Sequence, residues 1–298
     1  MATFKAYPSG ASMGCPGKGG ARENKRGSVN GWSAASVRRH VRWLWSVDVP
    51  ALDGDGYGVT LTVRDTPADH GDWKQLREAY LRKLRDAGCI RWHWVTEWQR
   101  RGTPHMHLAV YVPTGWLPPE APISDSAAAR RAVTQAWLTS TWCEVAGEYG
   151  ALWGAQVAKQ ITGPQGWLKY LAKHSARGVR HYQRQGVPSG WTGTGRLWGH
   201  GGSWPVVEPV AGVMEQATFF RMRRLVRRRL IAQARAQGDW RRVAYLRRML
   251  KNGDPTLSAV RGVSEWLPSD LFLTMAFAAG WSGELGAITD TSALPEVA

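Results

Sequence analysis

The chain has 298 residues, of which 43% are hydrophobic, and this suffices for one large domain with appendages or for two smaller domains. Its 39 lysines and arginines outnumber the 23 acidic residues, and the net charge of +16 favours a polyanionic partner such as nucleic acid or an anionic membrane surface. The three cysteines (Cys15, Cys89 and Cys143) are odd in number and far apart, which excludes a disulfide framework and a cysteine-based zinc site.

Two further features concern the location of the protein. The first residues are hydrophilic and lack the apolar core of a signal peptide. No uninterrupted apolar run approaches the roughly 18 residues of a membrane-spanning helix. We therefore expect a soluble, cytoplasmic protein without a membrane partner.

Residues 1–50 predict a basic, partly disordered N-terminal arm. Up to residue 31 the chain is rich in glycine, serine, lysine and arginine, a composition that does not support a packed core. The arm contains eight lysines and arginines against only Glu23 and Asp48. It can contact DNA phosphates or act as a solvating tail, and the sequence does not decide between these roles.

Residues 51–205 contain a regular series of predicted elements. Alternating residues predict a strand over 57–63, and apolar residues at helical spacing predict a helix over 73–88. Tryptophan, valine and threonine over 91–112 predict two strands joined by a turn. A helix, a weaker strand and a second helix are expected over 125–147, 152–161 and 164–176. This order predicts an α+β fold, an antiparallel sheet with helices packed on one face.

The last of these helices has an apolar side and a polar side. Because a helix turns by about 100° per residue, we place Trp167, Leu168 and Leu171 on the apolar side. Tyr170 and Lys173 are placed on the opposite side. The pattern fits an ordinary amphipathic helix, and it also fits a helix that docks on the sheet and presents its tyrosine to a site there.

Residues 213–298 predict a C-terminal extension that begins with two basic helices and ends in an acidic and apolar tail. Between 213 and 251, twelve lysines and arginines face only Glu215 and Asp239. Apolar residues recur at helical spacing on either side of Gly238, which predicts a helical pair. The pair can follow a DNA backbone, form a solvated face or lie on a membrane surface, and we favour DNA.

The hairpin over 91–112 carries three potential metal ligands. His105 and His107 are two residues apart on one strand, so both imidazoles leave the same face. A turn near residue 101 places Glu97 opposite them, and cross-strand neighbours lie about 5 Å apart. Two imidazoles and a carboxylate suit a divalent cation, although two histidines in a strand can also be polar residues on a solvated face.

Three motifs occur in one order over roughly half of the chain. They are the Thr-Leu-Thr segment at 60–62, the His-Met-His segment at 105–107 with Glu97 upstream, and Tyr170-Leu171-Ala172-Lys173. Together they resemble the first motif, the metal motif and the Tyr-x-x-Lys nucleophile motif of the HUH endonucleases. This family contains the rolling-circle replication initiators of plasmids and small phages.

The resemblance implies a ferredoxin-like HUH nicking domain over 51–205 that acts on single-stranded DNA at a replication origin. A Mn²⁺ or Mg²⁺ ion would be held by Glu97, His105 and His107. Tyr170 would attack the phosphodiester, with Lys173 one helical turn away, to give a 5′-phosphotyrosine link and a free 3′-OH for a polymerase. A host helicase would be needed because the chain has no ATP-binding motif. The site of action would be the cytoplasm of a bacterial host.

The chain departs from the two-tyrosine members of that family. Their nucleophile motif reads Tyr-x-x-Lys-Tyr, and His174 occupies the second tyrosine position here. The chain therefore resembles the one-tyrosine members. Tyr182 is an alternative nucleophile, but it lies outside the motif.

Other interpretations compete with a replication initiator. A non-catalytic, basic nucleic-acid-binding protein explains the charge and the 18 tryptophans, but not the combined presence of Glu97, His105, His107 and Tyr170. The fold family also contains relaxases and transposases. Relaxases usually have a three-histidine metal set, which Glu97 argues against, and transposases of this class are usually shorter than 298 residues. A membrane-surface protein is a further, weaker alternative.

Overall fold

The computed structural model describes residues 1–15, 31–176, 187–251 and 262–283. The chain divides into two compact units. The central unit consists of Lys25–Val41 and Val49–Pro205, and the terminal unit consists of Met1–Asn24, Arg42–Asp48 and Val206–Ala298. Helix α1 (Ala34–Ser46) contributes residues to both. In sequence, the central unit is therefore an insertion within the terminal unit.

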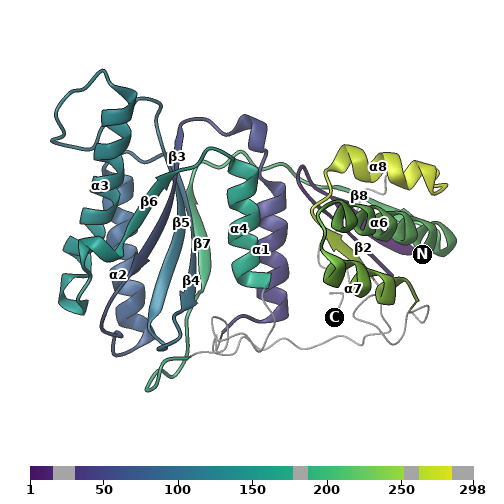
Figure 1. Cartoon of the computed structure of the whole chain (residues 1–298), viewed down its shortest axis with the longest axis horizontal. Coiled ribbons are helices and arrows are strands. Elements are labelled where there is room, and N and C mark those ends of the chain that lie inside the picture. Colours follow the sequence, from purple (N-terminus) through teal and green to yellow (C-terminus); the bar gives the residue numbers. More distant parts are fainter. Residues whose placement is uncertain (16–30, 177–186, 252–261, 284–298) are drawn as a thin grey trace. The chain divides into compact units, whose positions relative to one another are not determined.

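A five-stranded antiparallel sheet forms the middle of the central unit, with the strand order β6-β3-β5-β4-β7 (Figure 1). The strands are β3 (Asp55–Thr62), β4 (Arg91–Trp98), β5 (Pro104–Val112), β6 (Val157–Gln160) and β7 (Trp198–Gly202). Single 3₁₀ turns occur at Val49–Ala51, Gly147–Tyr149 and Trp153–Ala155. The predicted strand near 57–63 and the hairpin over 91–112 are confirmed. Strand β7 lies in a glycine-rich segment where no strand was predicted, and Gly199 and Gly201 leave room there for two tryptophan rings of β4.

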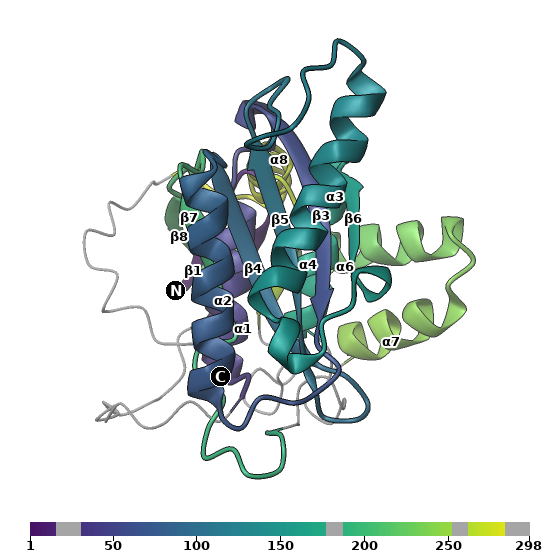
Figure 2. The ribbon, with the colours of Figure 1, turned by 90° about the vertical axis from the view of Figure 1, so that its left-hand side faces the viewer.

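Two helices, α2 (His70–Asp86) and α3 (Ala127–Val145), cover one face of this sheet (Figure 2). The Trp73 indole of α2 donates a hydrogen bond to the Thr96 hydroxyl of β4, at 3.2 Å. Asp69 caps the N-terminus of α2 by accepting hydrogen bonds from two backbone N–H groups of its first turn. A buried layer of aromatic and aliphatic side chains therefore separates these helices from the sheet.

The opposite face is covered by α4 (Pro164–Ala176) and by the first part of α1. The Trp167 ring of α4 lies over Gly58, and His40 of α1 stacks on His93 of β4. The α+β class and the antiparallel sheet are confirmed, but the placement of helices on one face is wrong. Strands β4 and β5 bury residues on both faces, as a sheet covered on both sides requires.

The terminal unit contains a second antiparallel sheet, of four strands in the order β8-β1-β2-β9. The strands are β1 (Ala2–Ala6), β2 (Ala11–Gly14), β8 (Val210–Met214) and β9 (Val263–Glu265). Its helices are α6 (Gln216–Ala236), α7 (Trp240–Lys251) and α8 (Ser269–Ala278). Helices α6 and α7 correspond to the predicted basic pair. No helix in the described ranges is long and apolar enough to cross a membrane.

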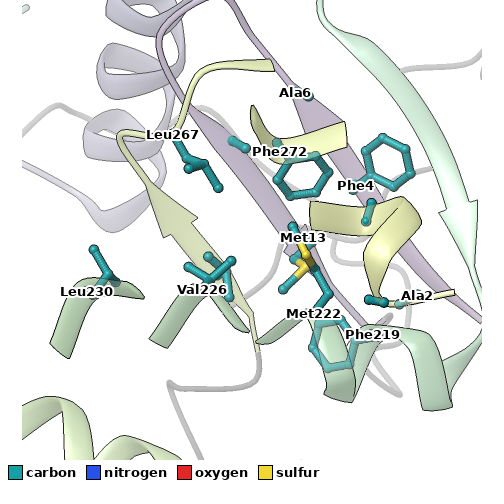
Figure 3. Packing of buried hydrophobic residues seen from close by; sticks show 14 of the residues in the cluster. Ala2, Phe4, Ala6, Met13, Phe219, Met222, Val226, Leu230, Leu267 and Phe272 are labelled. Atoms are coloured by element: carbon teal, nitrogen blue, oxygen red, sulfur yellow. The ribbon is translucent and has the colours of Figure 1, made fainter. Parts of the chain in front are cut away.

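The core of the terminal unit joins residues from both ends of the chain (Figure 3). Phe4 of β1 packs against Phe272 of α8, with ring centroids 5.2 Å apart. Met13 of β2 and Phe219 of α6 are buried in the same cluster. The hydrophobic effect therefore holds the first residues of the chain to helices α6 and α8.

These strands differ from the N-terminal arm that the sequence predicted over 1–50. In β1 the residues alternate between buried and half-buried, and β1 pairs on both sides, with β2 and β8. The basic composition of the segment comes partly from 16–30, which lies outside the described residues. Averaging over the whole segment concealed two short strands whose outer partners, β8 for β1 and β9 for β2, lie more than 200 residues away in sequence.

Candidate metal and nucleophile site

The β4–β5 hairpin places the three predicted metal ligands on one face. Its register pairs Glu97 directly with His105, and Val95 with His107. Residues paired in this way point to the same side of a sheet. The turn closes through a hydrogen bond from the Gln99 N–H to the Thr103 carbonyl, at 2.9 Å. The predicted juxtaposition of the carboxylate with both imidazoles is therefore present.

The ligand atoms of this cluster converge. The Nε2 atoms of His105 and His107 each lie 3.6 Å from the same oxygen of Glu97, Oε2. One potential ligand atom from each residue lies within 4.8 Å of the others. Glu97 is completely buried and His107 is 5% exposed. Such a carboxylate is costly to bury unless a cation or hydrogen-bond donors compensate its charge.

Thr60 of β3 orients one of the two imidazoles. The β3–β5 register pairs Thr60 with His107, and the Thr60 hydroxyl and His107 Nδ1 are hydrogen-bonded at 3.0 Å. This hydrogen bond occupies Nδ1 and leaves Nε2 facing Glu97. Residues that bond the second nitrogen of a ligating histidine fix its orientation in metal sites. Thr60 belongs to the predicted first motif, but its positioning role becomes evident only from the strand pairing.

The donor set fits a divalent cation. His105 Nε2 is buried and has no hydrogen-bond partner among the described residues, although it lies within reach of the same carboxylate. Two imidazole nitrogens and one carboxylate oxygen are ligands that Mn²⁺ accepts readily, and Mg²⁺ less readily. Among the described residues, no other group of three histidines, cysteines or carboxylates has comparable spacing.

Tyr170 of α4 lies beside this cluster. Its ring centroid is 5.7 Å from that of His107, and the two planes are nearly perpendicular at 88°. Tyr170 is 37% exposed, whereas the ligands beside it are largely buried. Lys173 is exposed one turn further along the helix. Helix α4 therefore brings an accessible phenol to the edge of the buried donor set.

Trp167 supports the tyrosine from within the same helix. The ring centroids of Trp167 and Tyr170 are 4.9 Å apart, so the two residues share a side of α4. We predicted Trp167 on the opposite side, and this was wrong because residues three apart are neighbours on a helix surface. Leu168 and Leu171 are buried as predicted. Tyr182, the alternative nucleophile, lies outside the described residues.

A second histidine cluster lies on the same face of the sheet but has no counterpart in the sequence analysis. His40 and His93 are completely buried, with their Nε2 atoms 3.0 Å apart. Burial lowers the pKa of His93 well below its usual value, and the positive charges that His40 and His200 can carry lower it further. His93 therefore belongs to the core in its neutral form, stacked on the His40 ring.

Comparisons with known proteins identify the family of the chain. The model of the ORF2-type replication-associated protein family matches residues 57–176, which contain all five predicted site residues. The replication-associated protein of Pseudomonas phage Pf3 is 39% identical over 283 residues, which cover 93% of this chain and 96% of that relative.

Two bacterial relatives are about as similar. Proteins named Putative replication protein from Xylella fastidiosa strains 9a5c and Temecula1 are each 40% identical, over 273 and 250 residues. These alignments cover 89% and 81% of this chain, and 90% and 89% of the relatives. No solved structure matches the chain significantly.

Proposed function

Because the chain belongs to the ORF2-type replication-associated protein family, we propose that it initiates rolling-circle replication by nicking and rejoining single-stranded DNA at an origin. The proposed reaction is a metal-dependent transesterification of one phosphodiester bond. It requires a nucleophile held beside a cation site, on a surface that a flexible strand can reach.

One observation carries this proposal. Tyr170 lies against His107, at the border between a buried cluster of metal-ligand type and solvent. A purely structural tyrosine on this helix would need no donor set beside it. A non-catalytic DNA-binding protein would have no use for a buried carboxylate between two imidazoles.

The roles proposed for the side chains rest on their positions. Glu97, His105 and His107 would hold Mn²⁺ or Mg²⁺, which would polarise the scissile phosphate and offset the charge on its oxygens. Thr60 keeps His107 oriented, and Trp167 supports the Tyr170 ring. Lys173 is one helical turn from Tyr170, where its ammonium group can stabilise a phenolate or the phosphate.

In this reaction the Tyr170 oxygen attacks the phosphorus and the bond to the 3′ oxygen breaks. The products are a 5′-phosphotyrosine link and a free 3′-OH, which a host polymerase can extend while a host helicase separates the strands. Because the phosphotyrosine retains the phosphodiester, attack by a 3′-OH can later restore a continuous strand.

The test is covalent capture of DNA. The protein is incubated with single-stranded origin DNA and Mn²⁺, and adducts that survive boiling in detergent are counted on a gel. We expect adducts with wild-type protein, none with Tyr170→Phe, and none after Mn²⁺ is removed by chelation.

Tyr149→Phe is the matched control, since Tyr149 lies outside the metal-ligand cluster, and it should form adducts normally. Glu97→Gln should retain DNA binding and lose adduct formation. Undiminished adducts with Tyr170→Phe, or their transfer to Tyr182, would exclude Tyr170 as the nucleophile.

A further inference from the structure

The terminal unit contains a helical hairpin of α6 and α7 that the proposed chemistry does not use. The two helices are joined at Gly238, whose φ of +68° suits glycine. Asp239 begins the second helix by accepting a hydrogen bond from the Arg242 N–H, at 2.9 Å. Neither helix contains an acidic residue. The hairpin therefore concentrates positive charge on a well-defined scaffold.

The arginines of α6 fall into two groups. Arg223 and Arg227 are buried, and Arg227 donates a hydrogen bond to the Glu265 carboxylate of β9, at 2.8 Å. These two belong to the packing of the unit. The other five are exposed: Arg221, Arg224, Arg228, Arg229 and Arg235.

Four of the exposed arginines form a line, which we call the basic stripe. Arg221, Arg224, Arg228 and Arg235 are separated by three, four and seven residues, so they share one side of the helix over roughly 21 Å. The apolar side of α6 is buried in the core. No ion pair within the described ranges involves the stripe. Among the described residues, its charge is therefore not neutralised by neighbouring carboxylates.

Helix α7 adds exposed aromatic rings, in what we call the aromatic strip. Trp240 and Tyr245 are 66% and 49% exposed. Arg241 and Arg248 are also exposed, and they lie one helical turn before and one turn after Tyr245. Large aromatic side chains usually lose solvent contact on folding, so two of them exposed beside arginines point to a partner with flat faces and negative charge.

We propose that the basic stripe and the aromatic strip bind single-stranded DNA, independently of the nicking site. Guanidinium groups bind phosphates through charge-assisted hydrogen bonds, and exposed rings stack on unpaired bases. The exposed rings favour single-stranded over double-stranded DNA, because the bases of a duplex already stack on each other. The inference extends the proposed role in replication, but binding here requires neither the cation nor Tyr170.

An anionic membrane surface fits these residues less well. A helix that lies on a membrane inserts an apolar face, and the apolar face of α6 is already buried. The exposed side of α7 combines two aromatic rings with arginines and carries no exposed leucine, isoleucine or valine among its described side chains. The surface therefore offers charge and stacking but little hydrophobic area for lipid.

The experiment measures binding of the full chain to a labelled 30-nucleotide strand of thymidines by fluorescence anisotropy, in EDTA and at several salt concentrations. The charge variant is Arg224→Gln/Arg228→Gln/Arg235→Gln. Its control, Arg82→Gln/Lys83→Gln/Arg85→Gln, removes the same charge from exposed positions on α2. The aromatic variant is Trp240→Ala/Tyr245→Ala, and its control is Trp153→Ala, which truncates a tryptophan that is 64% exposed in the central unit.

We expect the charge variant to reduce the dependence of log Kd on log salt by about 2, or about 0.7 for each lost phosphate contact, and its control to change it little. The aromatic variant should weaken single-strand binding roughly fivefold or more for each ring and leave duplex binding unchanged. Circular dichroism melting curves identify any variant that fails to fold, and single substitutions at the same positions then replace it.

Several results would overturn the inference. Equal losses of single-strand binding in the charge variant and its control would show that only the net charge of the protein matters, not the basic stripe. Equal weakening of single strands and duplex by the aromatic variant would assign the surface to duplex DNA. If the variants lost binding to phosphatidylserine vesicles but bound DNA as the wild type does, the surface would be assigned to membranes. Binding is measured in EDTA, where no nicking is expected. These results therefore test the inference even if Tyr170 fails to form adducts in the test of the proposed function.

Discussion

The hydrogen bond between Thr60 and His107 determines which imidazole nitrogen faces Glu97. We predict that Thr60→Val weakens Mn²⁺ binding about 10- to 100-fold, because the ring loses its orienting partner while the ligands remain. Isothermal titration calorimetry measures this constant directly. Thr60→Ser keeps the hydroxyl and should bind Mn²⁺ like the wild type. Equal affinity in the valine variant would show that Thr60 does not position the histidine.

His93 provides a prediction about pH. Its pKa is lowered in the folded protein, chiefly by burial, so the unfolded chain binds a proton more readily than the folded chain does. Its contribution to stability is fully present above the unfolded pKa of about 6.5 and is lost as the pH falls below that value. Urea denaturation at pH 7.5 and pH 5.5 should therefore show lower stability at the acidic pH.

His93→Asn is the comparison that isolates this residue from other titrating groups. The variant should be less stable than the wild type at pH 7.5, because a buried stacked ring is lost, but it should lose less additional stability on acidification. If acidification destabilised both proteins equally, His93 would not be the group responsible.

At the scale of the element, helix α4 rests on strand β3 at a point where only glycine fits. A Cβ atom added at Gly58 would lie 2.5 Å from the Trp167 ring, which in turn contacts Tyr170. We predict that Gly58→Ala displaces the tyrosine and slows adduct formation about 100-fold, since a misplacement of about 1 Å can have that effect. Affinity for Mn²⁺ should stay within a factor of a few.

Gly166 offers the matched control on the same helix. A Cβ atom added there meets no other atom within 4 Å, and no positive φ is involved. Gly166→Ala should leave adduct formation unchanged and stabilise the helix by about 0.5–1 kcal/mol. A normal rate in Gly58→Ala would mean that α4 tolerates the shift and that Trp167 does not position the nucleophile.

The contact between α6 and β9 gives two neighbouring arginines different effects on stability. The buried Arg227 is paired with the partly buried Glu265, and burial already raises the pKa of that carboxyl. Arg227→Gln should destabilise the protein by about 3 kcal/mol, because it leaves a carboxylate without its cation. Arg228→Gln, one residue further on the exposed side, should change stability by less than about 0.5 kcal/mol. Urea denaturation compares the two, and equal effects would contradict the assignment of Arg227 to packing.

At the scale of the whole molecule, the sequence predicted best the contacts between residues that are close together along the chain. Glu97 and His105 are separated by a single turn, so alternation along two adjacent strands was enough to place them opposite each other. The helix that carries Tyr170 was predicted from its apolar periodicity, and a resemblance connected it to the hairpin. The face of the sheet that this helix covers was not predicted, because periodicity within a helix does not tell which side of a sheet it packs on.

The division of the chain into two units also could not be predicted from local sequence patterns. Strand β1 is five residues long and finds its partner β8 at the far end of the sequence. The alternation within Ala2–Ala6 is too short to distinguish a strand from a tail. The arginines of α6 posed a similar problem, since the ion-pair partner of the buried Arg227 is Glu265 on β9, which is distant in sequence.

The insertion of one unit within the other has a consequence for biosynthesis. A ribosome completes the central unit by residue 205, but β8 and β9 emerge only later. Until then, the first two strands have no partner except each other, and a two-stranded hairpin is marginally stable at best in water. A nascent chain arrested after residue 205 should therefore resist protease across its middle while its first 15 residues are cleaved, and arrest beyond β9 and α8 should protect both.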